Sequence, residues 1–365
     1  MRAGYILFTA TVVVLTGACV KRVESQSRDK AIAAAAAAVD SAGVLIYPGE
    51  KHLANVTQLT FGGQNAEAYF NRDCSELIFQ STRDGHECDA IYRMNIDGSN
   101  VRMMSSGKGT TTCSFAAPDG KSIIYASTHA GGETCPPRPD MSHGYTWAIY
   151  ADYDIYKANP DGTNLVKLTN TPGYDAECVY SYQGDKILFT SLRTGDLEVY
   201  VMNPDGSGVE QLTNEPGYDG GAFFSLDGQW ICWRASRPKD SALTDYRDLL
   251  KMNLVRPSKL EIYIMNLKER KPIQLTSLNA GSFGPYFHPD GKRIVFASNY
   301  NDPKGRNFDL YMVDIATKEV EQITYNPSFD GFPMFSHDGK RLVFASNRNG
   351  KVRGETNIFI ADWAE

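Results

Sequence analysis

Two histidines and two carboxylates occur close together in the segment THAGGETCPPRPDMSHGYTW. They are His129, Glu133, Asp140 and His143, and imidazole and carboxylate groups are common metal ligands. Their spacing matches no compact ligand motif, and the intervening prolines predict an extended loop. The sequence therefore predicts no metal and no cofactor. A site that uses His129 and His143 remains an alternative.

Motifs for covalent or phosphate chemistry are missing from the sequence. There is no Gly-x-Ser-x-Gly segment to present an activated serine. The stretch GKGTTT, which begins at Gly107, lacks the residue order of a phosphate-binding loop. No catalytic residue is predicted, and the sequence favours a protein that is not an enzyme without settling the question.

The composition indicates a globular protein rich in β-structure. The 365 residues are 42% hydrophobic and 22% charged, with 17 Phe, 20 Tyr and 32 Gly. Aromatic side chains pack well on a pleated sheet, and glycines allow tight turns between strands. The net charge of −6, without a basic stripe, argues against a nucleic-acid partner.

One sequence motif recurs six times along the chain. It runs from a Leu-Thr-like ending through an aromatic-Ser-x-Asp-Gly-Lys turn to an apolar run that ends in Ser. Each copy divides into four short strands, and repeats of this length with four strands are typical of β-propeller blades. The endings of the six copies are marked by Thr60, Ser105, Thr169, Thr213, Thr276 and Thr324.

The pattern predicts an all-β fold: a six-bladed β-propeller of four-stranded antiparallel blades over residues 54–365. The last copy stops after its third strand, whereas a lone strand, ANVTQLT, precedes the first copy. Ala54–Thr60 can supply the missing strand, so we expect the ring to close by pairing the N-terminal strand with the last blade.

The amino-acid sequence of the repeat also resembles that of a known family. FSHDGKRLVFASNRNG and FHPDGKRIVFAS resemble the TolB-type propeller repeat, with its Pro-Asp-Gly-Lys turn and Leu-Thr ending. The resemblance covers about residues 54–365 and implies the same six-bladed fold. TolB proteins carry an α/β domain before the propeller, where this sequence has an Ala-rich stretch.

The N-terminus has the layout of an export signal. Arg2 precedes an apolar run and small residues that end at Cys19, which predicts a signal peptide over residues 1–18. LTGAC resembles the lipobox of bacterial lipoproteins, which implies lipidation of Cys19. An ordinary cleaved signal is the alternative. Residues 19–53 are expected to tether the domain on the periplasmic side of a bacterial membrane, and a soluble periplasmic protein is the second possibility.

The propeller topology places the loops that join a blade's second strand to its third, and one blade to the next, on a single face. Two long insertions, in the second and fourth blades, belong to this face, and the second is expected to form a lid helix with Thr244 as its cap. Charged residues repeated in every blade can equally stabilise the ring. The candidate binding face comprises Arg83, His86, His129, Glu133, Asp140, His143, Tyr145, Trp147, Asp175, Arg193, Asp219, Arg237, Tyr246, Asp330 and Arg348.

The cysteines add a prediction about cross-links. Export implies an oxidising compartment in which disulfides persist. Cys88 and Cys135 lie in loops of one face, and Cys113 and Cys178 each lie early in the inner strand of the next blade. The expected disulfides are therefore Cys88–Cys113 and Cys135–Cys178.

These observations favour a non-catalytic periplasmic propeller that binds a protein or peptide partner through its loop face. It would serve as an accessory subunit of a membrane complex. The alternative is a metal-assisted lyase or hydrolase of acidic saccharides that uses the His-rich face, as implied by resemblance to propeller lyases.

Overall fold

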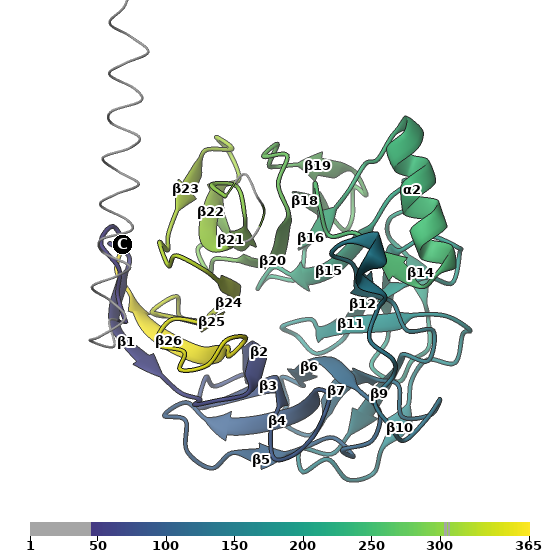
Figure 1. The fold of residues 1–365 in the computed structure, drawn as a ribbon, viewed down its shortest axis with the longest axis horizontal. Helices are drawn as coiled ribbons and strands as arrows, with labels where there is room; N and C mark the ends of the chain where they lie inside the picture. Colours follow the sequence, from purple (N-terminus) through teal and green to yellow (C-terminus); the bar gives the residue numbers. More distant parts are fainter. Residues whose placement is uncertain (1–44, 303–304, 306) are drawn as a thin grey trace, which may run out of the picture. The chain divides into compact units, whose positions relative to one another are not determined.

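Four antiparallel strands recur six times in the computed structural model, which describes residues 45–302, 305 and 307–365. We call the strands of each blade A to D, with A nearest the centre (Figure 1). Blades 1 to 3 comprise β2 (Gln64–Phe70), β3 (Glu76–Thr82), β4 (Ala90–Asn95), β5 (Arg102–Met103); β6 (Thr111–Ala116), β7 (Ile123–Ser127), β9 (Asp154–Ala158), β10 (Val166–Lys167); β11 (Asp175–Tyr180), β12 (Ile187–Ser191), β13 (Glu198–Met202) and β14 (Glu210–Gln211). Blades 4 to 6 comprise β15 (Asp219–Phe224), β16 (Trp230–Ala235), β18 (Glu261–Asn266), β19 (Pro272–Gln274); β20 (Ser282–Phe287), β21 (Arg293–Ser298), β22 (Asp309–Asp314), β23 (Val320–Gln322); β24 (Asp330–Phe335), β25 (Arg341–Ser346), β26 (Asn357–Trp363) and β1 (Leu53–Gln58).

The ring closes as expected, by a strand from the N-terminal side. β1 pairs antiparallel with β26, from Leu53 opposite Trp363 to Gln58 opposite Phe359. The packed unit begins at Leu45, upstream of the expected boundary at Ala54. The carbonyl of Leu45 accepts a 2.6 Å hydrogen bond from Arg348 of blade 6. The closing segment is therefore longer than one strand.

The Leu-Thr endings of the repeat have a specific structural role. In every blade the hydroxyl at this position accepts a hydrogen bond of 2.8–3.0 Å from a backbone N–H of strand C. Because a buried backbone donor without a partner is costly, a hydroxyl recurs here in all six blades. The set is Thr60, Ser105, Thr169, Thr213, Thr276 and Thr324.

Strand B of each blade carries one large buried side chain. One aromatic residue recurs there in each blade and is almost wholly buried. Each such side chain removes a large apolar area from water, which is the main favourable term for a repeat that cannot cover its own faces. These residues are Phe79, Tyr125, Phe189, Trp233, Phe296 and Phe344.

Every A strand contains a β-bulge at the same place. The pairing of A with B slips there, and the bulged residue has a φ between 50° and 60°. A bulge bends the strand and re-aims the side chain that it carries. The six bulged residues are Glu67, Cys113, Glu177, Gly221, Gly284 and Phe332, and we call them the channel ring.

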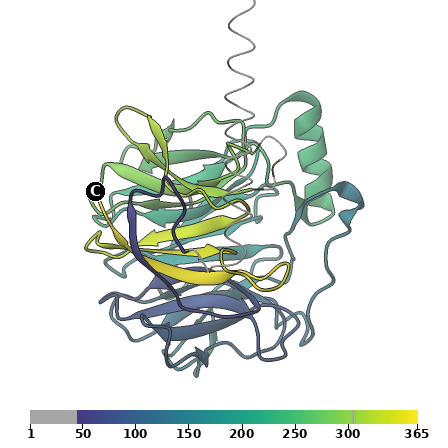
Figure 2. The ribbon, with the colours of Figure 1, turned by 60° about the vertical axis from the view of Figure 1, so that its left-hand side comes forward.

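The two insertions leave blades 2 and 4 between strands B and C, as predicted, and project from the same face (Figure 2). We call this face, which carries the B–C and D–A loops, the loop face. The blade 2 insertion contains η1 (Met141–His143) and β8 (Trp147–Ala148), and the blade 4 insertion contains α2 (Asp240–Lys251) and β17 (Leu254–Val255). β8 pairs with β17, so the two insertions form one structure.

The predicted lid helix is present as α2, with Tyr246, Leu249 and Leu250 buried. The expected cap is wrong. Lys239 is the N-cap residue and makes no side-chain capping bond, while Thr244 lies inside the helix and donates to the carbonyl of Asp240. The helix begins at Asp240, four residues before Thr244, so Thr244 lies beyond its first turn.

The predicted signal peptide, Cys19 and most of the tether lie outside the described residues. Among the residues described, no helix has the length and apolar character needed to cross a membrane.

The closing strand provides a stability test. Val56 of β1 is 8% exposed, whereas its neighbour Thr57 faces solvent. We expect Val56→Asp to lower the free energy of unfolding by several kcal/mol, because it places a charge in an apolar contact. Thr57→Asp adds the same charge and should change stability by less than about 0.5 kcal/mol. Urea denaturation of both variants measures the difference, and equal stabilities would contradict the role assigned to β1.

Candidate functional site

The repeated charges of the loop face are paired within their own blades. Arg193 contacts Asp175 at 3.1 Å, and Arg237 holds Asp219 through two hydrogen bonds of 2.7 and 2.8 Å. Burial raises the pKa of Asp219 to about 6, against the opposing effect of Arg237. These side chains are occupied, so they stabilise the ring and do not form an open ring of ligand-binding charges.

In blade 6 the same arginine–aspartate ion pair also includes a residue of the closing segment. Arg348 contacts Asp330 at 2.7 Å and Glu50 at 3.1 Å, and all three side chains are fully buried. Glu50 also accepts hydrogen bonds from the backbone N–H groups of Tyr47 and Tyr325. The cluster therefore joins residues on both sides of the ring closure.

In blade 2, His129 takes the place of the repeated arginine. Its Nδ1 lies 2.8 Å from Ser127 Oγ, just as Arg193 Nε lies 2.8 Å from Ser191 Oγ. Burial and the nearby Lys167 lower the pKa of His129. Arg83 lies over the rings of Phe79 and Tyr92 in its own blade.

The remaining candidates of the blade 2 insertion hold that insertion together. Asp140 accepts hydrogen bonds from the backbone N–H and hydroxyl of Ser142, and the carbonyl of His143 accepts one from Arg256 of the other insertion. Glu133 pairs with Lys108. His86 is half-buried beside Gly107. In the part of the chain that the structure describes, no group of three or more His, Cys, Asp or Glu residues could hold a metal ion.

Trp147 extends the blade 2 insertion toward the centre of the ring. Its indole makes edge contacts with Tyr218 of the loop before blade 4 and with Phe283 of blade 5, at centroid distances of 6.4 and 6.1 Å. Arg234 of β16 lies 5.2 Å from the same ring. From the other insertion, Tyr246 of α2 donates a hydrogen bond to Asp196. The insertions therefore lie over the channel at blades 3 to 5.

Beneath Trp147, the channel ring carries a buried ionic cluster. Arg234 donates hydrogen bonds to Glu177 and to the hydroxyl of Tyr218, and that hydroxyl donates to Glu177 at 3.1 Å. Glu177 also accepts from Thr190 Oγ1 at 2.6 Å and from the Gly221 N–H at 2.8 Å. A Cβ on Gly221 would lie 1.9 Å from Arg234 Nη1, so only glycine leaves room for the guanidinium.

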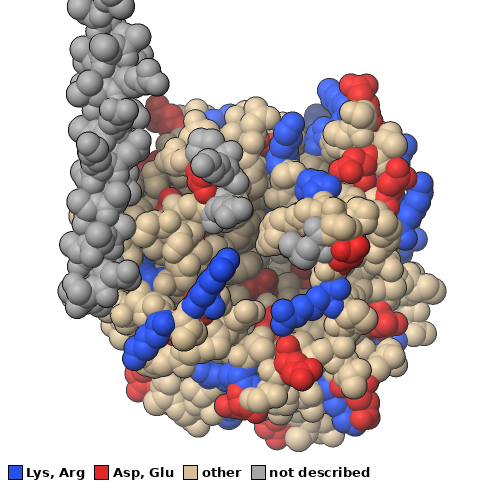
Figure 3. Space-filling model, in the orientation of Figure 1, with Lys and Arg blue, Asp and Glu red and all other residues tan. Residues whose placement is uncertain are grey.

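Glu67 is the second carboxylate of the channel ring. Its Oε2 is buried and has no hydrogen-bond partner within the described chain. Burial raises the pKa of Glu67 to about 7, opposed by a hydrogen bond from the Cys113 thiol. Glu67 and Cys113 remain partly exposed as residues, so they border an open space in the channel. Figure 3 shows a hollow at the centre of this face with acidic atoms deep inside it.

An aromatic layer closes the channel below the channel ring. Tyr69 of blade 1 contacts Phe115 of blade 2 at 5.8 Å and Phe223 of blade 4 at 5.4 Å, between ring centroids. Phe223 in turn contacts Tyr286 of blade 5 at 5.4 Å. Contacts between blades 1 and 4 cross the centre, so the space beside Glu67 opens only toward the loop face.

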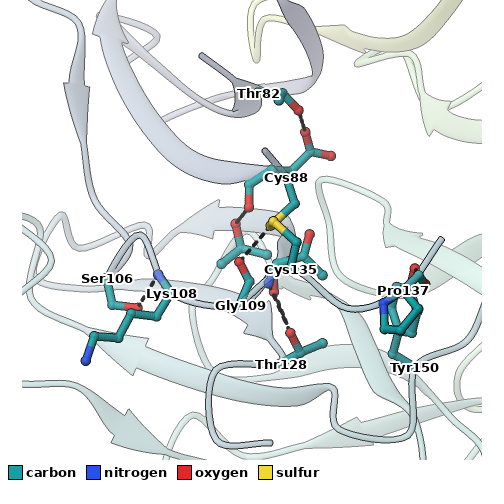
Figure 4. Close-up of a disulfide and its surroundings, with 12 residues drawn as sticks. Thr82, Cys88, Ser106, Lys108, Gly109, Thr128, Cys135, Pro137 and Tyr150 are labelled. Atoms are coloured by element: carbon teal, nitrogen blue, oxygen red, sulfur yellow. Dashed lines mark hydrogen bonds between the residues drawn. A yellow bond between two sulfur atoms is a disulfide. The ribbon is translucent and has the colours of Figure 1, made fainter. Parts of the chain in front are cut away.

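The predicted disulfides are wrong. Cys88 is bonded to Cys135, whereas Cys113 and Cys178 are free thiols. Figure 4 shows the bond, with Cys88 Sγ 2.9 Å from the carbonyl of Gly109 and the Tyr150 hydroxyl donating to the carbonyl of Pro137. The bulge turns Cys113 into the channel, away from the loops, so the two loop cysteines pair with each other. Cys232 is buried in strand B of blade 4.

Sequence reasoning missed the residues that line the channel, namely Glu67, Glu177 and Arg234. A signal was present. Glu67 and Glu177 each lie two residues before an apolar residue of the innermost strand, in a register where other blades carry Cys, Gly or Phe. Carboxylates inside otherwise buried strands could have been recognised by aligning the six copies.

The comparisons with known proteins agree with this architecture. The PD40 family, described as the TolB beta propeller domain, matches residues 257–362. A TolB homolog from Chlorobium luteolum is 25% identical over 144 residues, a match that spans 33% of this chain and 33% of that protein.

Solved structures resemble this chain in fold. TolB from Acinetobacter baumannii is 18% identical, with a TM-score of 0.55 over 73% of this chain and 56% of that chain. A TolB-type structure from Agrobacterium tumefaciens is 16% identical, with a TM-score of 0.56 over 85% and 97%. An oligogalacturonate lyase from Vibrio parahaemolyticus is 14% identical, with a TM-score of 0.51 over 84% and 93%.

Six four-stranded antiparallel sheets arranged around a central channel define a six-bladed β-propeller. More narrowly, the chain is a TolB-like propeller, since the repeat, the matched domain and the solved TolB structures agree.

The cluster at the ring closure predicts a large mutational effect. Arg348→Met leaves Asp330 and Glu50 buried without their counter-charge, so we expect the free energy of unfolding to fall by about 3–5 kcal/mol. Arg353→Met removes an exposed arginine from the same loop and should change it by less than about 0.5 kcal/mol. Chemical denaturation compares the two, and a small effect at Arg348 would refute the assigned role.

The disulfide predicts a defined thiol pattern. Alkylation without reduction, followed by peptide mass spectrometry, should find Cys88 linked to Cys135, and Cys74, Cys113, Cys178 and Cys232 alkylated after denaturation. Cys88→Ser/Cys135→Ser should lose up to about 4 kcal/mol by the loop-entropy relation, since 47 residues separate the pair. A Cys88–Cys113 peptide would contradict the structure.

Proposed function

We propose that the protein is a non-catalytic propeller of the cell envelope that binds a protein or peptide partner through its loop face, as an accessory subunit of a membrane complex. The observation that carries the proposal is the distribution of exposed apolar side chains. Among the described residues, the three most exposed large hydrophobic side chains are Phe61, Val352 and Tyr145, at 68%, 68% and 64%. All three lie in loops of this one face.

Such side chains are typical anchors of protein interfaces. When exposed aromatic and aliphatic side chains gather on one face of a protein, that face is commonly a binding surface for another protein. Phe61 and Val352 belong to neighbouring loops, because Gly62 N–H donates to Glu355 and Thr356 N–H donates to the carbonyl of Gly63. They provide an apolar region at blades 6 and 1, and Tyr145 extends the face on the blade 2 insertion.

The location belongs to the same proposal. The export-signal layout and the lipobox-like LTGAC support a periplasmic protein anchored through Cys19. The Cys88–Cys135 disulfide is compatible with an oxidising compartment. Similarity to TolB proteins supports an envelope role with protein partners.

The test uses the full-length, tagged protein purified from its native membrane after mild cross-linking. We expect a specific partner whose recovery falls at least tenfold, about 1.4 kcal/mol or more, when Phe61, Tyr145 or Val352 is replaced by Ser. Quantitative mass spectrometry of the captured proteins provides the measurement.

Val166→Ser serves as the matched control. Val166 is 55% exposed but lies in the outer strand β10, away from the loop face. It should leave recovery of the partner unchanged. Recovery that is insensitive to all three loop-face variants, or equally sensitive to Val166→Ser, would rule out the proposed surface.

A further inference from the structure

The channel ring contains one carboxylate, Glu67, for which the described part of the chain provides no salt bridge. Glu177 is satisfied by Arg234, Tyr218, Thr190 and the Gly221 N–H, as described above. Glu67 has no salt bridge, and its buried Oε2 has no hydrogen-bond partner within residues 45–302 and 307–365. The Cys113 thiol donates to this carboxylate, so a donor from outside the chain is needed for Oε2 alone when Glu67 is ionised.

The charge of the space favours a cation. Glu177, Asp89 and Arg234 all act electrostatically on Glu67. When Glu67 is ionised, Glu67 and Glu177 together outweigh the single positive charge of Arg234, and Asp89 adds to the negative potential. Arg234 Nε also lacks a partner, but its positive charge is already balanced by Glu177. The unmet requirement is therefore a positively charged donor beside Glu67.

The surroundings favour an organic cation over a metal ion. No group of three or more metal-ligating side chains occurs in the described part of the chain, so a bare divalent ion would lack ligands. The space is bounded below by the aromatic layer that includes Tyr69, and Trp147 of the blade 2 insertion packs against Tyr218 and Arg234 at one side of it. Aromatic walls around a carboxylate suit an alkylammonium group, which is apolar on one side and a strong donor on the other.

We propose that the central channel is a binding site for a primary alkylammonium group, with Glu67 as its counter-ion. The group enters from the loop face, because the aromatic layer closes the other side. It belongs either to a free amine or to a lysine side chain of a peptide. This inference goes beyond the proposed function, since it concerns a small ligand in the channel and not the apolar surface at Phe61, Tyr145 and Val352.

Binding should depend on pH in a predictable direction. The pKa of Glu67 in the unliganded protein is raised to about 7 by burial, so the carboxylate is mostly protonated at pH 6 and mostly ionised at pH 8. The groups that act on it are Cys113, Glu177, Arg234 and Asp89. Only the ionised form attracts an ammonium group, so affinity should rise about tenfold from pH 6 to pH 8 and level off above that.

The experiment is isothermal titration calorimetry of the full-length protein with two probes, N-acetyl-lysine N-methylamide and cadaverine. N-acetylnorleucine N-methylamide is the uncharged comparator. Saturable binding of either ammonium probe at pH 8, at least tenfold weaker at pH 6 and in Glu67→Gln, supports the site. The probe that binds more tightly distinguishes a peptide side chain from a free amine.

Glu87→Gln is the matched control, because Glu87 is an exposed glutamate of the same blade and face. It should bind the probes as the wild type does. If Glu67→Gln does not fold, the pH profile of the wild-type protein still decides the question. No binding at pH 8, or binding that is independent of pH and of Glu67, overturns the proposal. Neither result depends on the macromolecular partner.

Discussion

The pairing of β1 with β26 is the contact on which the rest of the structure depends. A propeller blade exposes apolar surface on both faces, and only its neighbours on each side cover it. The ring must therefore close, and here it closes through residues at opposite ends of the packed chain. Arg348, Asp330 and Glu50 reinforce this junction from within, since each is buried and depends on the other two.

Recurring polar residues explain how such a ring tolerates buried hydrogen-bonding groups. In every blade the hydroxyl at the Leu-Thr position accepts a hydrogen bond from a backbone N–H of strand C. In blades 2, 3 and 6 an arginine or His129 contacts the serine that ends strand B. These interactions serve the fold, so the repeated charges of the loop face are poor indicators of ligand binding. Function must be sought where the blades differ from one another.

The blades differ most at the two insertions and at the channel ring. β8 and β17 join the insertions over blades 3 to 5, and the disulfide Cys88–Cys135 attaches the blade 2 insertion to blade 1. Trp147 is thereby held over a channel that contains one satisfied carboxylate, Glu177, and one unsatisfied carboxylate, Glu67. The loop face thus carries two distinct surfaces. One is formed by the exposed apolar side chains of its loops, and the other is the acidic channel beside Glu67.

The sequence alone determined the blade number, the four-strand unit, the closing strand and the position of both insertions, because periodicity and turn residues act locally and recur six times. It could not determine the partners of Cys88 and Cys135, the pairing of Trp147–Ala148 with Leu254–Val255, or the meeting of Glu67, Glu177 and Arg234. Those depend on how bulges and loops aim side chains from different blades across the ring, and that geometry arises only when the ring is closed.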